Sequence, residues 1–284
     1  MKYTYAEFLD ILDWELQQEK QGGDSAQADK FRFLPHTQAL RVINETIREL
    51  AVISQDQFER EYNYTVTVDG TKHIQLPEFI IKAIAYWHST DECWKILGDS
   101  SDLTSELVSI DSATIYNASG WAEGDVVKLK VIAFPHEVIA EEESVSYDSY
   151  ENNTITLNYG DSGESLMAGQ KLTILDASAS RYEDFLIDQR DYQVVAKLFL
   201  NKEIKANPIP PAAITNSSNI IPIPTAYSRL LILEIKRKVY ARKGKAISTY
   251  EYSELMKLKA QWTEETSPIQ HKARIAFEGY GLGR

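Results

Sequence analysis

The sequence has few of the residues that carry redox or metal chemistry. Its 284 residues include one cysteine, Cys93, and five histidines that are scattered along the chain. A disulfide within the chain needs two cysteines, and structural zinc sites need closely spaced cysteine and histidine ligands. We therefore expect no disulfide, no bound metal and no cofactor.

Long hydrophobic runs are also missing. The longest apolar stretches fall far short of the roughly 20 residues that a membrane-spanning helix needs. The first residues lead into an amphipathic segment and not into the apolar core of a signal peptide. Because 43% of the residues are apolar and 25% are charged, the composition is that of a globular protein. These features predict a soluble protein made in a cytoplasm.

The common catalytic motifs are absent as well. There is no phosphate-binding glycine loop, no Gly-x-Gly-x-x-Gly and no His-Glu-x-x-His. The loop from Gly160 to Gly163 is similar to the nucleophile loop of trypsin-like serine proteases, but Glu164 stands where that family has a further glycine, and the histidine and aspartate contexts are missing. Gly98-Asp99-Ser100 is an equally short esterase-like match. We expect no enzyme; a hydrolase would have to use Ser162 or Ser100.

Charge is unevenly distributed along the chain. The net charge is −12, yet residues 226–274 carry eleven Lys and Arg against five Glu, while residues 137–164 carry eight acids and no base. Opposed potentials of this kind steer docking between complementary surfaces. The alternative is a pair of solvated faces without a partner. Lys236-Arg237-Lys238 could also neutralise phosphates, although these bases spiral around a helix and do not form one stripe.

Two helices are predicted near the N-terminus. Thr4-Tyr5-Ala6-Glu7 is a capping box, in which the side chains of the first and fourth residues each accept a backbone N–H bond from the other. The apolar positions that follow have helical spacing: Tyr5, Phe8, Leu9, Leu12 and Leu16. Thr37 is expected to cap a second helix through Ala51. Asn44 lies beside its apolar stripe, either as a polar anchor to a neighbouring backbone or as an exposed residue.

The period changes to two after Glu61. Alternating apolar residues up to Asp69-Gly70, followed by residues 72–76, predict a β-hairpin that Pro77 ends. Residues 80–87 are ambiguous between strand and helix, and we favour a strand. Further strands are expected at 125–134, 154–159, 171–176 and 192–200, separated by glycine-rich turns. Residues 105–176 therefore indicate a small antiparallel β subdomain.

A helical hairpin is predicted towards the C-terminus. Pro224-Thr225 opens it, with Thr225 available as a cap, and Gly244 ends the first helix. The antiparallel partner helix runs from Tyr252 to Trp262. Beyond Ser267-Pro268 no helical period remains, so residues 267–284 are expected to form an extended tail.

This order of segments resembles the head-to-tail adaptor (connector) proteins of tailed bacteriophages. The likeness rests on the helix from Thr4, the second helix with Val42-Ile43-Asn44-Glu45-Thr46-Ile47, the hairpin that returns to Leu76-Pro77-Glu78-Phe79, and the block from Ile223 to Leu231 with a basic end at Gly244. It covers about residues 1–85 and 190–265. Residues 90–190 depart from the compact adaptor pattern because they form a large β-rich elaboration.

The resemblance implies an α+β fold: a helical bundle and hairpin core with a β-hairpin, an inserted antiparallel β-rich subdomain and an extended C-terminal tail. The core would be residues 1–88 and 190–266, the insertion 89–189 and the tail 267–284. The implied function is mechanical: a dodecameric ring in the virion neck that joins the portal to the tail and continues the DNA channel. The implied partners are the portal protein, a downstream tail or neck protein, other copies of the chain, and passing DNA without sequence specificity.

The resemblance also assigns candidate surfaces. Residues predicted to contact the portal or a neighbouring subunit come from the hairpin and the tail: Tyr227, Arg229, Lys236, Arg237, Lys238, Arg242, Lys243, Lys245, Trp262, Ile275, Phe277 and Tyr280. From charge alone, Glu141, Glu142 and Glu143 are hypothesised to line the channel. The alternatives are another neck or tail component, such as a stopper or tail-tube gatekeeper, and a nucleic-acid-binding module.

Overall fold

A computed structural model describes residues 3–17, 34–53, 58–99, 106–111, 113–158, 166–176, 181–191, 196–205 and 214–265. Their four α-helices are α1 (Tyr5–Gln17), α2 (His36–Ile53), α3 (Ser228–Arg242) and α4 (Thr249–Glu265), and a short 3-10 helix, η4 (Thr225–Tyr227), precedes α3. The chain divides into two compact units. The helical unit lies within Met1–Gln57, Val138–Ala140 and Asn219–Arg284, and the β unit lies within Phe58–Glu137 and Glu141–Ser218.

The fold class predicted from the sequence is wrong. The described residues are 38% strand and 31% helix, and the largest sheet is a curled sheet of seven strands, so the core of the protein is not a helical bundle. The strands form a unit of their own, with boundaries after residues 57 and 218, whereas the expected boundaries fall after residues 88 and 189. The described α-helices lie towards the two ends of the chain with all the described strands between them. How these strands pair depends on residues distant in the sequence, which local patterns do not specify.

In the helical unit, segments from the two ends of the chain lie side by side. Thr4 forms an isolated β-bridge with Ile220, and the backbone N–H of Ile221 donates to the carbonyl of Tyr3 at 2.8 Å. The predicted capping box of α1 is confirmed: the Thr4 N–H donates to Glu7 Oε2 at 2.8 Å, and the Glu7 N–H donates to Thr4 Oγ1 at 3.3 Å. The α1 stripe predicted from helical spacing is buried throughout.

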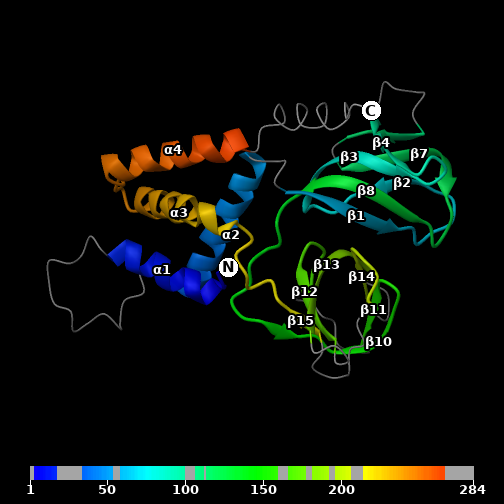
Figure 1. The fold of residues 1–284 in the computed structure, drawn as a ribbon, viewed down its shortest axis with the longest axis horizontal. Helices are drawn as coiled ribbons and strands as arrows, with labels where there is room; N and C mark the ends of the chain where they lie inside the picture. Colours follow the sequence, from blue (N-terminus) through cyan, green and yellow to red (C-terminus); the bar gives the residue numbers. More distant parts are fainter. Residues whose placement is uncertain are drawn as a thin grey trace, which may run out of the picture. The chain divides into compact units, whose positions relative to one another are not determined.

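The helix α3 lies at the centre of this unit, between α1 and α4 in Figure 1, and contacts each of the other three helices. Its buried residues surround the helix axis: Leu230, Leu231, Ile232, Leu233, Glu234, Ile235, Lys236, Val239 and Tyr240. A helix buried on all sides belongs to a core and not to a surface. The expected caps differ in detail, since Thr37 lies inside α2 and η4 has no side-chain cap.

Asn44 of α2 is a polar anchor, which resolves the two alternatives that the sequence left open. Its Nδ2 donates to the carbonyl of Val138 at 2.9 Å, and its Oδ1 accepts the Val138 N–H at 2.8 Å. The side chain is 8% exposed. Two reciprocal hydrogen bonds in a buried place hold Val138–Ala140 in the helical unit, although the residues on either side belong to the β unit.

We expect Asn44→Ala to release this segment. Both polar groups of Val138 would lose their partner in a buried place, which costs about 1–3 kcal/mol. The measurement is the hydrogen-exchange rate of the Val138 amide, which should rise. Glu45→Ala is the control: among the described residues its carboxylate pairs with Arg242 alone, in an exposed ion pair at 3.1 Å, so the Val138 amide should exchange as in the wild type.

The described residues of the β unit form three sheets. The strands are β1 (Glu59–Thr65), β2 (Thr71–Gln75), β3 (Ile80–His88), β4 (Cys93–Ile96), β5 (Gly98–Asp99), β6 (Leu107–Ser109), β7 (Thr114–Trp121), β8 (Val126–Ala133), β9 (Glu143–Ser144), β10 (Tyr147–Glu151), β11 (Thr154–Leu157), β12 (Lys171–Asp176), β13 (Arg181–Asp191), β14 (Lys197–Leu200) and β15 (Ile214–Asn216). Two four-stranded sheets have the orders β1-β8-β3-β4 and β2-β7-β6-β5, and the seven-stranded sheet has the order β10-β11-β14-β13-β12-β15-β9.

The hairpin predicted around Asp69-Gly70 does not form. The turn is present, with Gly70 at a φ of +73°, but β1 pairs with β8 and β2 pairs with β7, so the two strands belong to different sheets. The Gly70 N–H donates to the carbonyl of Trp121 at 2.9 Å, on β7 and not on β1. A turn signal fixes a change of direction, whereas pairing depends on partners distant in the sequence. The strand favoured at residues 80–87 is confirmed as β3.

The described residues of the β unit bury two apolar cores. One lies between the two four-stranded sheets and includes Tyr62, Ile74, Leu129 and Val131, and the other lies within the curled sheet and includes Ile155, Phe185 and Leu198. Each core combines alternate residues of antiparallel strands, as expected where one face of a sheet is buried.

A polar cluster joins β1 to β13 inside the β unit. The Asp188 carboxylate, which is 0% exposed, accepts the Asn63 backbone N–H at 2.8 Å and Arg60 Nη1 at 3.1 Å. Two residues further along β1, the backbone N–H of Thr65 donates to the side chain of Gln189 at 3.1 Å. Since β1 is an edge strand of its sheet, side chains of β13 satisfy backbone groups that a further strand would otherwise pair.

Burial dominates the electrostatics of this cluster. It raises the pKa of Asp188 to about 7, and the charge of Arg60 and the N–H of Asn63 only partly oppose this rise. Burial lowers the pKa of Arg60 and raises the pKa of the Tyr62 hydroxyl. The two charges are therefore mutually dependent, because each can remain ionised in this environment chiefly through the other.

Candidate interaction surface of the helical hairpin

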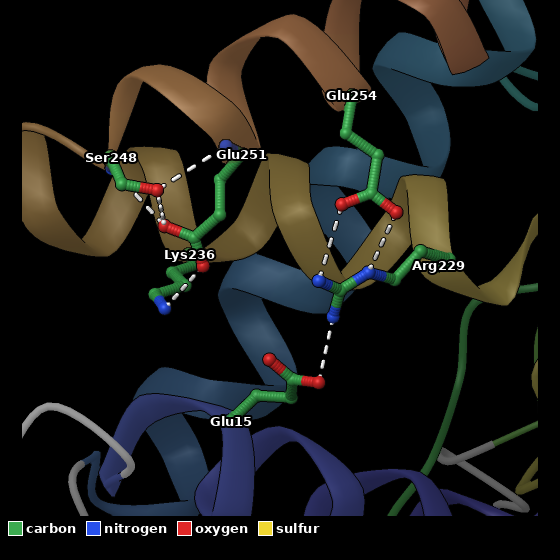
Figure 2. Close-up of polar contacts among 6 residues, drawn as sticks. All are labelled: Glu15, Arg229, Lys236, Ser248, Glu251 and Glu254. Atoms are coloured by element: carbon green, nitrogen blue, oxygen red, sulfur yellow. Dashed lines mark hydrogen bonds and ion pairs between the residues drawn. The ribbon is translucent and has the colours of Figure 1, made fainter.

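The basic residues of α3, which the sequence suggested as an interface, form ion pairs inside the helical unit. Arg229 joins three helices: Nη1 lies 2.7 Å from Glu15 of α1, and Nε lies 3.3 Å from Glu254 of α4. Figure 2 shows its guanidinium held between these two carboxylates. Because a guanidinium is planar and rigid, its bonds to two carboxylates fix the positions of both carboxylates relative to it. Arg229 therefore locks α1 and α4 onto α3.

Lys236 pairs with the first turn of α4. It is 3% exposed, and its Nζ lies 2.6 Å from Glu251 Oε1. Glu251 also forms a capping box with Ser248: the Ser248 N–H donates to Oε2 at 3.1 Å, and the Glu251 N–H donates to Ser248 Oγ at 3.2 Å (Figure 2). This capping box was not predicted, although Ser248-x-x-Glu251 has the same spacing as the box at Thr4.

Glu234 is the buried carboxylate of α3. Its side chain is 3% exposed and lies between two cations, with Oε1 2.5 Å from Arg237 Nη2 and Oε2 2.9 Å from Lys259 Nζ. Burial raises the pKa of Glu234, but the bonds from Arg237 and Lys259 outweigh it, so the pKa is lowered from its usual value. The same balance lowers the pKa of Glu251, where the bonds from Lys236 and Ser248 outweigh burial.

Acid should therefore loosen the helical hairpin. A carboxyl group whose pKa is lower in the folded state stabilises the fold above its unfolded pKa, 4.5 for Glu, and loses this contribution as the pH falls through the folded pKa. We expect the urea midpoint, followed by helical circular dichroism, to fall between about pH 5 and pH 3. In the double variant Glu234→Gln/Glu251→Gln the urea midpoint should be lower at pH 7 and should change less with pH than in the wild type. A midpoint that falls with pH as steeply as in the wild type would contradict the role of these two carboxylates.

The remaining bases of α3 and the two aromatic candidates are also engaged. Lys238 Nζ lies 2.7 Å from Glu49, and Arg242 Nη2 lies 3.1 Å from Glu45. Trp262 is 0% exposed and donates its indole N–H to the carbonyl of Leu50 at 3.1 Å. The Tyr227 ring meets it edge to face, with centroids 4.5 Å apart. Tyr227 and Trp262 therefore lie in the helical core and not on a docking surface.

The end of the hairpin is exposed. Lys243 and Lys245 lie on the surface where α3 turns into α4, and beside them is a groove of about 400 Å³ lined by Arg237, Ala241, Lys245, Ala246, Ile247, Thr249 and Tyr252. Large apolar side chains are exposed on α4 nearby, with Tyr252 51% and Met256 50% exposed. Of the predicted interface residues, Arg237 and Lys245 are thus brought together, whereas Arg229 and Lys236 serve the packing of the helices.

The predicted acidic segment is on the surface of the β unit. Glu141, Glu142 and Glu143 are exposed, and Glu143 begins β9, the edge strand of the curled sheet. None of the three forms an ion pair with another described residue. The predicted interface residues Ile275, Phe277 and Tyr280, with the rest of the tail from 267 to 284, lie outside the described residues, as do Ser100 and Ser162.

Neither a metal site nor a membrane span is found in the part of the chain that the structure describes. No three His, Cys, Asp or Glu side chains in that part gather closely enough to hold a metal ion. None of its helices has the length and apolar character that crossing a membrane requires. Cys93 is exposed and unpaired with another cysteine.

Comparison with known proteins adds no relative. No protein-family model matches the chain, and no curated protein matches it at a significant level.

Proposed function

We propose that this chain is a structural subunit of the virion neck of a tailed bacteriophage: a head-to-tail adaptor that assembles as a ring between the portal and the tail. The helical motifs from Thr4, at residues 42–47 and from Ile223 to Leu231, with their order, support the adaptor role, although the expected hairpin does not form. The ring would be a dodecamer that continues the DNA channel. On this proposal the chain binds the portal protein, a tail-side protein and other copies of itself, and performs no chemical turnover.

One observation carries this proposal: charge is divided between the two units. The residue ranges of the β unit contain 12 Lys and Arg against 26 Asp and Glu, a net charge of −14, whereas those of the helical unit sum to +2. A ring is built from heterologous contacts, in which one face of a subunit meets a different face of the next. Opposite charge on two parts of one chain favours such head-to-tail contacts and disfavours contacts between like faces.

The internal ion pairs also favour a structural role over nucleic-acid binding. Arg229, Lys236, Lys238 and Arg242 each pair with a glutamate of the helical unit. Bases neutralised in this way have little charge left for phosphates, whose binding depends on releasing counterions. We therefore expect weak affinity for free DNA, without the steep salt dependence of a nucleic-acid-binding module.

Co-sedimentation with the cognate portal, the large ring protein encoded nearby, tests the proposed function. The chain should sediment with assembled portal rings and should not sediment with purified tails lacking a portal. A stopper or tail-tube gatekeeper would show the reverse preference. Binding to neither, together with tight salt-dependent binding to DNA, would contradict the proposal.

A further inference from the structure

The groove at the turn between α3 and α4 is suited to a short segment. Its volume of about 400 Å³ is within the range of sites that take a few side chains and too small for a folded surface. Small and apolar residues, among them Ala241, Ala246 and Ile247, form much of its lining. Gly244, with a φ of +66°, allows the turn that brings these residues together.

The electrostatics of the groove select an acidic occupant. Arg237 and Lys245 line it, and the lining contains no carboxylate. Arg237 also bonds to the buried carboxylate of Glu234, which Lys259 contacts from the other side. Thr249, the first residue of α4, also lies in the lining, and the N-terminus of a helix carries a partial positive charge.

The chain itself contains a segment with the matching chemistry. Ala140 and Glu141 to Glu143 form an exposed run of one small residue and three carboxylates. This run reaches β9 at the outer edge of the curled sheet, where an edge strand is accessible to another molecule. With no ion pair to a described residue, its charge remains available for a partner.

We propose that the groove between α3 and α4 binds the acidic segment Ala140–Glu143 of a second copy of this chain. The inference rests on the proposed function, because it supplies a head-to-tail contact between copies in the ring. Lys245 and Arg237 would face the carboxylates, and the alanines of the groove would contact Ala140. The contact replaces the channel-lining role that charge alone suggested for Glu141 to Glu143.

Peptide binding tests the groove. A fluorescent peptide of residues 140–146 should bind the full chain, measured by anisotropy, and affinity should fall as salt rises. In Lys245→Glu one attraction becomes a repulsion, so affinity should fall about tenfold. Lys257→Glu also replaces a lysine by a glutamate, but at an exposed residue of α4 outside the groove lining, and this variant should still bind the peptide. A peptide with glutamines at 141–143 should not bind. Equal binding by both variants would overturn the inference.

Cross-linking between separate copies tests the occupant. In a Cys93→Ser background, one copy would carry Tyr252→Cys and another Glu142→Cys, and a short bis-maleimide would link them during assembly on the portal. We expect a linked dimer from this pair and its loss when Lys257→Cys replaces Tyr252→Cys. If the chain forms a ring on the portal but this cross-link is absent, the inference is overturned and the adaptor role still stands. If the peptide binds the groove but the chain forms no ring on the portal, the adaptor role alone is contradicted.

Discussion

Arg60→Met should lower the free energy of unfolding of the β unit by about 3–5 kcal/mol at pH 8. The methionine retains much of the packing of the arginine stem but leaves the Asp188 carboxylate, which is 0% exposed, without its cation. A buried charge that has lost its partner is strongly destabilising. Urea-dependent hydrogen exchange of the β1 and β13 amides measures the effect in the unit concerned.

The cost of Arg60→Met should depend on pH. Burial raises the pKa of Asp188 to about 7 in the folded chain, above its usual value of 3.8. A raised carboxyl pKa favours the fold at low pH, and this contribution is lost as the pH rises from about 4 through 7. At pH 5 Asp188 can remain protonated and needs no cation, so the variant should lose much less stability than at pH 8.

Lys130→Met is the matched control for Arg60→Met. Lys130 lies on β8, which pairs with β1, and its Nζ is 3.8 Å from Glu59 with the lysine side chain 35% exposed. A pair of this kind contributes at most about 1 kcal/mol, and its removal should have little dependence on pH above pH 5. Equal and pH-independent losses in Arg60→Met and Lys130→Met would contradict the interpretation of the cluster.

Trp262→Ala should lower the free energy of unfolding of the helical unit by about 3–5 kcal/mol. The indole is fully buried, packs edge to face against Tyr227 and donates to the carbonyl of Leu50. Its loss removes a large apolar contact and the link from α4 to the C-terminal turn of α2. Near-ultraviolet circular dichroism during thermal unfolding should show a lower Tm.

Two further variants of α4 show whether the loss of stability comes from the buried indole or from any large side chain on this helix. Trp262→Phe retains most of the apolar contact but removes the indole N–H, and should cost about 1–2 kcal/mol. Met256→Ala lies on the same helix at a residue that is 50% exposed, and should remain within about 0.5 kcal/mol of the wild type. A large loss in Met256→Ala alone would mean that the exposed face of α4 supports the fold.

Local signals in the sequence predicted many elements and few of their pairings. The capping box at Thr4 and the apolar stripe of α1 depend on residues within four positions of each other, and both are confirmed. Strand β12 also lies where predicted, at Lys171–Asp176. Strand β13, which is the longest described strand, was not predicted, because Arg181–Asp191 alternates weakly and carries six charged residues.

The candidate surface was harder to predict from sequence. The bases of α3 indicated a docking face, yet most of them pair with glutamates that lie up to 214 positions away in the sequence, as Arg229 does with Glu15. A charge run gives no information on such partners. The same limit hid the buried pair of Arg60 and Asp188, which are 128 positions apart. The groove depends on how tightly the chain turns at Gly244, which sequence spacing alone does not fix.

Electron cryo-microscopy of the chain mixed with its cognate portal tests the adaptor role most directly. We expect a collar of twelve copies on the portal, with the helical hairpin against the portal and the groove of each copy facing the acidic segment of its neighbour. Portal rings without added density, with the chain found instead on tails or on free DNA, would contradict it.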